Sequence, residues 1–214
     1  MKVLLLVNGE LYKPEILRNR INAEACDIVI GTDGGVRHAE TLDVKVDVII
    51  GDMDSLQDTT PQTTINAELI SYPVEKDETD LELALLYAKE KGAEKIVMVG
   101  AIGGRMDMTI SNILLMTSES LSACRVEVWH GEQTGWIIRP PGEYIHGNPG
   151  DTLSLIPLGE YASGVTTTRL KYPLKEARLF PGKARGLSNI LDDSRAHVAL
   201  SEGLLLAIHT PGRA

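Results

Sequence analysis

The chain has 214 residues, 43% of them hydrophobic, and a formal net charge of −9 from 30 acidic and 21 basic residues. This length allows one large domain or two small ones, and the composition is that of a globular protein. Only 4% of the residues are aromatic. The acidic balance argues against a nucleic-acid partner or an anionic membrane, because both recruit Lys and Arg.

The two cysteines and the N-terminal segment bear on where the protein acts. Cys26 and Cys124 are too few for a disulfide framework, and each lies beside an expected strand, so we expect reduced thiols. The opening segment MKVLLLVNGE has five consecutive apolar residues, which suits a first buried strand better than a signal peptide. No apolar run reaches the length of a membrane-spanning helix. We therefore expect a cytoplasmic protein.

Short apolar runs alternate with helical patterns up to residue 138. Several of the runs lack polar alternation, as is typical of strands that are covered on both faces. Strands that alternate with helices indicate an open α/β domain with a mainly parallel sheet. The expected strands are KVLLLV (2–7), CDIVIG (26–31), VDVIIGD (46–52), KIVMVGA (95–101) and RVEVWH (125–130).

One helix is predicted with particular clarity, over TDLELALLYAKEKG. Its apolar residues recur at the helical spacing i, i+3, i+4, i+7. Thr79 and Glu82 have the spacing of a capping box, and Gly92 supplies a stop. The pattern predicts a helix that begins just after Thr79 and buries Leu81 and Leu85.

The pattern changes at RPPGEYIHGNPGD (139–151), where prolines and glycines exclude a helix. Five short strand-like runs follow, with no strong amphipathic helix. We expect residues 139–214 to form a small antiparallel β-sandwich domain after an α/β domain of residues 1–138. The runs are TLSLIPL, GVTTTRLKYPL, KEARLF, HVALS and LLLAIHT.

Two acidic segments directly follow expected strands. In TDGGVRHAE, Asp33 precedes Gly34 and Gly35; an ordinary strand-to-helix turn would also explain this pattern. In GDMDS, Asp52 and Asp54 end a buried strand. At about 5 Å and an effective dielectric near 20, their repulsion would cost on the order of 3 kcal/mol. Either water screens the two carboxylates or a cation lies between them.

Two further segments belong to the same group. In KDETD, Asp77 and Asp80 precede the predicted helix, where acidic residues are also favoured by the helix dipole alone. In GAIGGRMDMTISN, a strand leads through Gly103, Gly104 and Arg105 into a second helix. Such glycines allow main-chain nitrogens to approach an anion, and an arginine adds a forked donor for phosphate. No Lys-Ser or Lys-Thr follows, so the loop is not a P-loop.

The four segments together predict more than each does alone. All follow strands of one parallel sheet or begin its helices, and ligands bind at the carboxyl edge of such a sheet. Carboxylates and a Gly-Gly-Arg loop at one edge suit Mg²⁺ and a polyphosphate. The residues therefore predict phosphoryl or pyrophosphoryl transfer from a nucleotide.

The order of these segments resembles the thiamine pyrophosphokinase family. TDGG, GDMDS, KDETDLELAL and GAIGGRMDMTISN resemble motifs of its catalytic domain, and GDTLSLIPL, TTTRLKYPL and RGLSNI resemble motifs of its β-sandwich domain. The resemblance implies transfer of the terminal diphosphate of ATP to the hydroxyl of thiamine, which gives thiamine diphosphate and AMP. It also implies a homodimer with a nucleotide-binding catalytic domain, a thiamine-binding and dimerisation domain, and a thiamine site at the subunit interface.

The resemblance also implies roles for individual residues. The Mg²⁺ ligands would be Asp52, Asp54, Asp77 and Asp80. ATP would contact Asp33, Gly34, Gly35, Asp52, Gly103, Gly104 and Arg105. Thiamine would contact Asp107, Asn112, Ser188 and Asn189. Catalysis would depend on Asp54, Asp80 and Arg105.

Three other functions stay open at the level of sequence. Met108 stands where the family commonly has histidine, and Arg169 where it has glycine, which keeps open another small alcohol as acceptor, such as a hydroxymethylpterin. Asp52 and Asp54 also have the spacing of a haloacid-dehalogenase phosphohydrolase, although Leu56 replaces the usual Thr. A nucleotide-sensing module without turnover is the non-enzymatic alternative.

Overall fold

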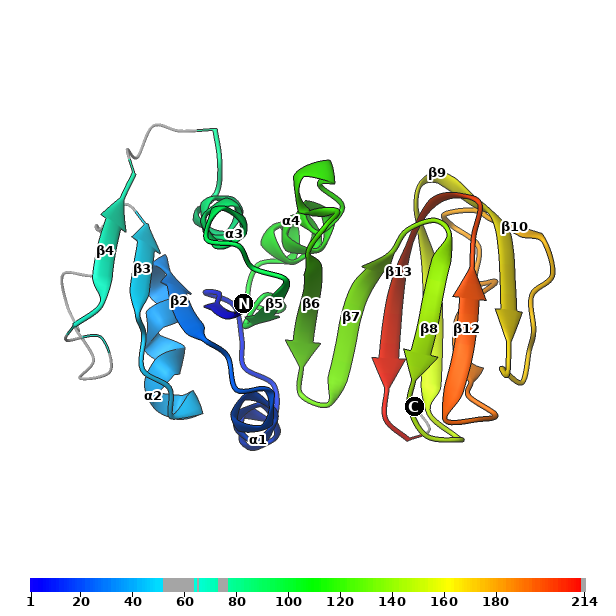
Figure 1. Cartoon of the computed structure of the whole chain (residues 1–214), viewed down its shortest axis with the longest axis horizontal. Helices are drawn as coiled ribbons and strands as arrows, with labels where there is room; N and C mark the ends of the chain where they lie inside the picture. The colour runs from blue at the N-terminus through cyan, green and yellow to red at the C-terminus, as the bar shows by residue number, and fades with distance from the viewer. Residues whose placement is uncertain (52–63, 65, 73–76, 213–214) are drawn as a thin grey trace. The chain divides into compact units, whose positions relative to one another are not determined.

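The computed structural model describes residues 1–51, 64, 66–72 and 77–212. The chain divides into two compact units, Met1–Glu132 and Gln133–Ala214 (Figure 1). The expected boundary after residue 138 lies at the end of strand β7 (Gln133–Ile138), which belongs to the second unit. Each unit has its own apolar core.

The first unit contains a parallel sheet with the strand order β4-β3-β2-β1-β5-β6. The chain builds outward from β1 to β4, then returns to place β5 on the other side of β1. The α/β domain with a parallel sheet is confirmed. The strands are β1 (Lys2–Leu6), β2 (Ile28–Thr32), β3 (Val48–Gly51), β4 (Glu68–Ser71), β5 (Lys95–Val99) and β6 (Arg125–His130).

Helices cover both faces of this sheet. Helices α1 (Pro14–Glu24) and α2 (His38–Leu42) lie on one face, and α3 (Asp80–Glu90) and α4 (Met106–Leu115) on the other (Figure 1). Two short 3₁₀ helices, η1 (Asp33–Arg37) and η4 (Glu119–Leu121), also belong to this unit. Coverage on both faces explains the continuous apolar runs, such as Val3 to Leu6, which is fully buried.

The predicted helix over residues 79–92 is confirmed as α3. Its N-cap, Thr79, accepts a hydrogen bond at Oγ1 from the main-chain nitrogen of Glu82, 3.2 Å away. Leu81 and Leu85 are buried, as the spacing predicts, and Gly92 follows the helix with φ at 83°. The N-cap, the apolar stripe and the final glycine act through residues that are close in sequence, which is why the sequence alone predicts this helix.

Strand β4 was not predicted. Its residues, ELIS, are mostly exposed, and among the strands that the structure describes it pairs with β3 alone, at the edge of the sheet. Without burial on either face, such a strand shows neither an apolar run nor alternation.

The second unit is antiparallel throughout its described pairings. Strand β9 (Thr152–Thr168) spans two of the predicted runs as one 17-residue strand and passes from one layer of the β-sandwich to the other. Its first half pairs with β13 (Glu202–Thr210), and its last residues pair with β12 (Arg195–Ala199). The remaining strands are β8 (Gly142–His146), β10 (Ala177–Leu179) and β11 (Asn189–Ile190).

The inner faces of these strands form the core of the second unit. Ile138, Leu153, Leu155, Val165 and Leu205 are buried there. Strand β8 lies inside the segment 139–151, in which proline and glycine were expected to exclude a helix and no strand was predicted. Within the described residues, no helix is long and apolar enough to cross a membrane.

Candidate functional site

A cavity of about 470 Å³ opens at the carboxyl edge of the first unit's sheet. It lies where the loops after β1, β2 and β5 meet the first turn of α3 and the inner face of α4. Strands β1 and β5 are adjacent although β2, β3 and β4 come between them in the chain. The loops after two such strands diverge to opposite faces of the sheet, which leaves a crevice for a ligand.

The cavity brings together three of the four predicted segments. Asp33 comes from the loop after β2, Asp80 from the start of α3, and Gly103 to Arg105 from the loop after β5. Asn112 on α4 also lines it. Carboxylates and a glycine loop therefore share one cavity, as their positions after parallel strands predicted.

Asp52 and Asp54 lie outside the described residues, so their position relative to the cavity stays a prediction. Asp77 is described; it is exposed and is not among the residues that line the cavity. Across residues 1–51, 64, 66–72 and 77–212, no group of three His, Cys, Asp or Glu side chains has metal-binding geometry. At the N-terminal end of α3, the carboxylate residues Glu78 and Asp80 line the cavity.

Gly34 and Gly35 are needed for close packing. A Cβ atom at Gly35 would collide with the carbonyl oxygen of Leu6 in β1, and one at Gly34 would lie 2.7 Å from the side chain of Asn8. Neither glycine is among the lining residues of the cavity. Both allow the loop after β2 to approach β1, which holds Asp33 at the cavity wall.

The main-chain nitrogens of the Gly103–Gly104 loop donate to two side chains. Gly103 N lies 3.1 Å from Oγ1 of Thr109, and Gly104 N lies 3.1 Å from Oε1 of Glu10. Both glycines have left-handed φ values, 95° and 73°. This conformation favours glycine and turns successive N–H groups toward acceptors.

Arg105 and Asp107 form an exposed forked ion pair at the start of α4. Nε of Arg105 lies 3.1 Å from Oδ1 of Asp107, and Nη2 lies 2.5 Å from Oδ2. The hydrogen bond from Arg105, with a second from the main-chain nitrogen of Met108, lowers the pKa of Asp107. Arg105 lines the cavity, whereas Asp107 lines a shallow depression on the outer side of α4.

Asn112 is the one predicted site residue on α4 that is buried, with 4% of its surface exposed. Its Nδ2 donates to the carbonyl oxygen of Ala101 over 2.9 Å, which sets the orientation of the amide. Among the described residues, Oδ1 has no hydrogen-bond partner. The bond to Ala101 O holds the amide against the loop after β5. A buried carbonyl oxygen without a partner is costly, so Oδ1 is an acceptor that a donor on a bound ligand would satisfy.

Ser188 and Asn189 belong to the second unit. Asn189 is buried, and its amide binds the main chain: Nδ2 donates to Tyr172 O over 2.7 Å, and Oδ1 accepts from the nitrogens of Tyr172 and Ile190 at 3.0 Å. Ser188 is exposed, has φ of 52°, and donates from its main-chain nitrogen to Ser154 Oγ. Asn189 thus shapes the segment around Tyr172.

Sequence reasoning missed the loop after β1. Asn8 and Gly9 line the cavity, and Glu10 binds Gly104. The sequence did contain a signal, because Asn-Gly-Glu directly follows the first apolar run. The other predicted segments were identified by the same kind of position, directly after an expected strand. Met108, where histidine was the expected residue, also lines the cavity.

Two family models match the chain. "Thiamin pyrophosphokinase, catalytic domain" covers residues 21–128, and "Thiamin pyrophosphokinase, vitamin B1 binding domain" covers residues 140–205. These two ranges fall within the first and the second compact unit respectively.

Individual relatives agree with the family models. The chain is 33% identical to a thiamine pyrophosphokinase of Bacillus subtilis over 164 residues, which are 75% of this chain and 76% of the relative. It is 26% identical to thiamine pyrophosphokinase 1 of Oryza sativa over 176 residues, 77% of this chain and 66% of the relative.

Solved structures show the same fold. The crystal structure of thiamine pyrophosphokinase from Bacillus subtilis superimposes with a TM-score of 0.83 at 24% identity and covers 99% of both chains. Thiamin pyrophosphokinase from Candida albicans has a TM-score of 0.75 at 18% identity, with 98% of this chain and 88% of the other covered.

Proposed function

The chain belongs to the thiamine pyrophosphokinase family, and we propose that its first unit binds ATP with Mg²⁺ in the cavity beside β1 and β5. The enzyme transfers the terminal diphosphate of ATP to the hydroxyl of thiamine and releases AMP. The observation that carries the nucleotide site is the meeting of Asp33, Asp80 and the Gly103–Arg105 loop in one cavity.

The phosphates are the part of ATP that these residues suit best. Arg105 offers a planar guanidinium, which can bind two phosphate oxygens at once. Its present partner, Asp107, forms an exposed pair, and exposed pairs contribute little to stability. Exchanging that carboxylate for a phosphate therefore costs little. Asp33, Gly34 and Gly35 complete the nucleotide half of the proposal, with the two glycines acting through the position of Asp33.

A divalent cation is a family property, and Mg²⁺ is the ion that oxygen ligands and phosphates favour. We assign its protein ligands to Asp80 and Asp77 at the start of α3 and to Asp52 and Asp54 after β3. Carboxylate oxygens are the right donor type, and Asp80 and Glu78 bring negative charge to the cavity wall. When bound, the cation neutralises charge on the transferred diphosphate.

The reaction makes a bond from the thiamine hydroxyl oxygen to the β-phosphorus and breaks the bond from that phosphorus to the oxygen that leaves with AMP. The residues contribute mostly alignment and charge stabilisation, since little covalent chemistry is required of the protein. Arg105 stabilises the phosphate oxygens, and the hydroxyl proton passes to a carboxylate. Asp54 and Asp80 are the proposed acceptors of that proton.

For the acceptor, we propose that thiamine contacts Asp107 and Asn112 of one subunit and the Ser188–Asn189 segment of its partner. A homodimer would allow residues from both units to meet at an interface. Two features support this. Helix α4 exposes an apolar stripe, Met106, Ile110 and Leu114, which are 79%, 54% and 48% exposed.

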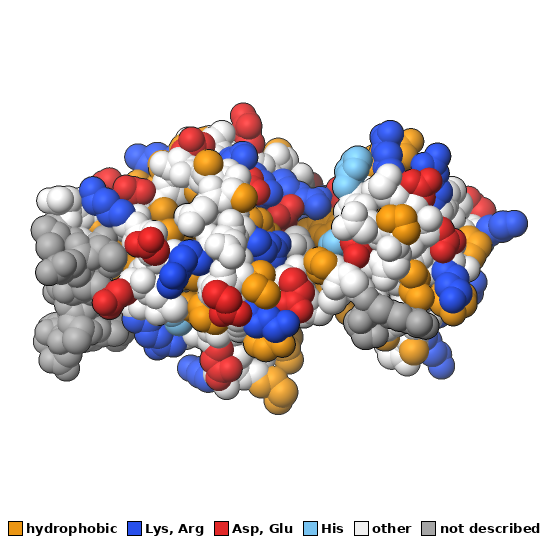
Figure 2. All heavy atoms as spheres, turned by 90° about the horizontal axis from the view of Figure 1, so that it is seen from below, with side chains coloured by type: hydrophobic (Ala, Val, Ile, Leu, Met, Phe, Trp, Pro, Cys, Tyr) orange, Lys and Arg blue, Asp and Glu red, His pale blue; other side chains and the backbone are white. Residues whose placement is uncertain are grey.

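The charge of the two units supports the same arrangement. The acidic excess lies in residues 1–132, whereas residues 133–214 contain more Lys and Arg than Asp and Glu. On the face in Figure 2, Lys and Arg side chains recur around the second unit. Opposite charge on the two kinds of unit favours contact between copies. Light scattering of the native enzyme and of Ile110→Asp tests this, with a shift toward monomer expected for the variant.

The activity is tested by AMP release with ATP, Mg²⁺ and thiamine, followed beside direct detection of thiamine diphosphate. We expect AMP formation that requires thiamine and stops when EDTA removes the cation. A hydroxymethylpterin serves as the control acceptor and should give no AMP. Thiamine-independent AMP, or AMP with the pterin alone, would reject the acceptor. Any steady turnover also excludes the sensing module.

Cytoplasmic location remains part of the proposal. Its support is that Cys26 and Cys124 are both free thiols. Fractionation of the source cells, with the enzyme followed by its activity, would test it.

A further inference from the structure

Two consecutive residues that have no assigned role, Arg37 and His38, bind the main chain of the cavity wall. Nη2 of Arg37 lies 3.2 Å from the carbonyl oxygen of Asn8 and 3.1 Å from that of Gly9. Nε2 of His38 lies 3.0 Å from the same Gly9 oxygen. A carbonyl oxygen only accepts, so His38 donates from Nε2.

The segment they hold, Asn8–Glu10, continues to the loop after β5. The main-chain nitrogen of Gly9 donates to Gly100 O over 2.7 Å, and that of Glu10 donates to Ile102 O over 3.0 Å. The carboxylate of Glu10 then accepts from Gly104 N. The chain of hydrogen bonds thus runs from the end of η1, through Asn8–Glu10, to the glycine loop on the other side of the cavity.

Close packing leaves this arrangement little freedom. A Cβ atom at Gly9 would collide with the carbonyl oxygen of Gly100, and one at Gly100 would lie 3.2 Å from the ring of His38. Residue His38 is only 7% exposed, so its side chain is enclosed where it meets Gly9. Packed groups of this kind have few alternative positions and transmit a displacement to what they touch.

We propose that Arg37 and His38 are positioning residues for nucleotide binding, because they hold Asn8–Glu10 against the loop after β5 and thereby set the Gly104 nitrogen at the cavity. The inference rests on the proposed nucleotide site in this cavity. Neither residue lines the cavity, so their effect on the nucleotide passes through the main chain of Asn8 and Gly9. Small displacements of groups that orient a substrate cost large factors in rate.

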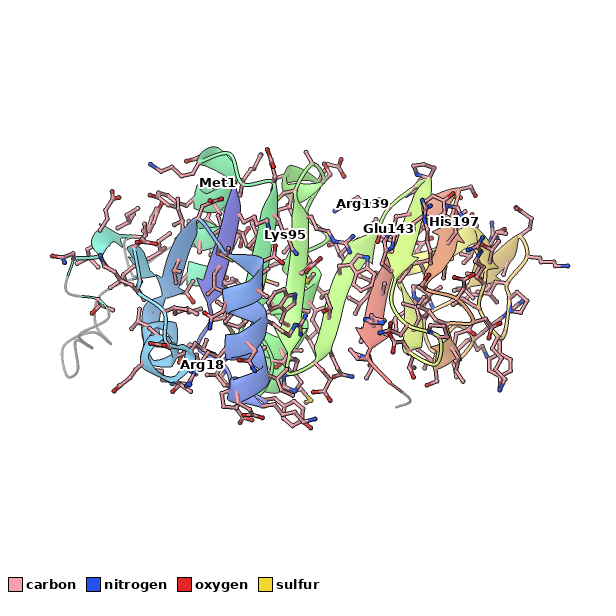
Figure 3. All side chains as sticks on the ribbon, turned by 60° about the horizontal axis from the view of Figure 1, so that its bottom comes forward. Met1, Arg18, Lys95, Arg139, Glu143 and His197 are labelled. Carbon is pink, nitrogen blue, oxygen red and sulfur yellow. The ribbon has the colours of Figure 1, made fainter. Side chains whose placement is uncertain are left out.

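The test compares Arg37→Ala with Arg18→Ala in the full-length enzyme. Both arginines are exposed and donate to main-chain carbonyls, but Arg18, on α1 (Figure 3), binds Thr41 O, and neither it nor Thr41 lines the cavity. We expect Arg37→Ala to raise KM for ATP about tenfold and to leave KM for thiamine within about twofold, with no change for Arg18→Ala. Isothermal titration with ATP and Mg²⁺ should show the same loss of affinity.

His38 provides an independent test through a matched pair of variants. His38→Gln retains an amide N–H that can reach Gly9 O, whereas His38→Leu fills similar space without a donor. We expect KM for ATP to stay within about threefold for the glutamine variant and to rise about tenfold for the leucine variant. Glu10→Gln and Glu10→Ala should divide in the same way, because only glutamine keeps an acceptor for Gly104 N.

The outcomes separate this inference from the function on which it rests. If the native enzyme makes thiamine-dependent AMP but Arg37→Ala and His38→Leu retain the native KM for ATP, the positioning role is wrong and the function stands. If both variants lose affinity for ATP and thiamine equally, with a lower melting temperature, the residues only stabilise the fold and the inference is also overturned. Absence of AMP from the native enzyme would instead reject the function.

Discussion

Asn112 donates from Nδ2 to the carbonyl oxygen of Ala101, and this buried bond ties the inner face of α4 to the loop after β5. Asn112→Asp removes the Nδ2 donor and brings a carboxylate into a buried position, since the residue is only 4% exposed. We expect a loss of about 3 kcal/mol in unfolding free energy, against about 1 kcal/mol for Asn112→Ala. Urea denaturation measures both, with Ser111→Ala as the control on the outer side of the same helix. Equal losses for Asp and Ala would contradict the burial argument.

Asp80 and Asp77 offer a comparison within one segment. Only Asp80 lines the cavity. We expect Asp80→Asn to lower kcat by at least about a hundredfold, since it removes a charge from the proposed metal and proton-transfer site. Asp77→Asn should cost less, about tenfold. Initial rates over a range of Mg²⁺ concentrations measure both effects. A larger loss for Asp77→Asn would place the metal outside the cavity.

Lys95, at the start of β5 (Figure 3), pairs with two carboxylates. Their side chains are only 16% and 12% exposed. Nζ of Lys95 lies 2.9 Å from Glu24 and 3.4 Å from Glu127. Glu24 also pairs with Lys2, and Glu127 also pairs with Arg125, so each carboxylate keeps one cation when Lys95 is removed. We therefore expect Lys95→Ala to cost about 1 kcal/mol of unfolding free energy. The exposed pair of Arg169 and Asp193 is the control, and Arg169→Ala should change stability by less than about 0.5 kcal/mol. Similar losses of unfolding free energy in Lys95→Ala and Arg169→Ala would contradict the expectation that the buried pair matters more than the exposed one.

His38 predicts how stability depends on pH. Burial lowers the pKa of His38, with a smaller contribution from Arg37 in the same direction, while Gly9 O opposes the shift. As the pH falls, His38 of the unfolded chain therefore binds a proton near its ordinary pKa of 6.5, whereas His38 of the folded chain binds one only at a lower pH. Stability is fully present above pH 6.5 and falls as the pH falls through the lower, folded value. Burial also lowers the pKa of His130, which adds in the same direction.

Urea denaturation at about pH 7.5 and about pH 5.5 measures this effect, because carboxylates remain largely ionised across that interval. We expect the native protein to lose stability at the lower pH and His38→Gln to lose less. Equal pH dependence in the two proteins would show that His38 does not contribute.

Cys26 should be unreactive in the folded protein. Burial, with the nearby charge of Glu24, raises the pKa of its thiol to about 11. At pH 8 about one thiol in a thousand is then ionised, and only the thiolate reacts with iodoacetamide. We expect labelling of Cys26 at least tenfold slower than in urea, followed by mass spectrometry of the peptides. Fast labelling of the folded enzyme would contradict the raised pKa.

The amino-acid sequence alone determined the features that depend on nearby residues. Thr79, the apolar spacing of Leu81 and Leu85, and Gly92 specified α3, since capping and amphipathic packing act within a few residues. Uninterrupted apolar runs specified the covered parallel strands, and acidic and glycine-rich segments after them indicated the cavity edge.

Only the tertiary structure decided which loops share the cavity. The adjacency of β1 and β5 brings Asn8–Glu10 to the Gly103–Gly104 loop, although about ninety residues separate them in the chain. It also showed that Gly35 packs on Leu6 and that the Asn189 amide binds Tyr172. Such relationships depend on long-range packing and hydrogen bonds, which leave no periodic pattern in the sequence. Strand β4 escaped notice for the same reason, because only its pairing with β3 makes it a strand.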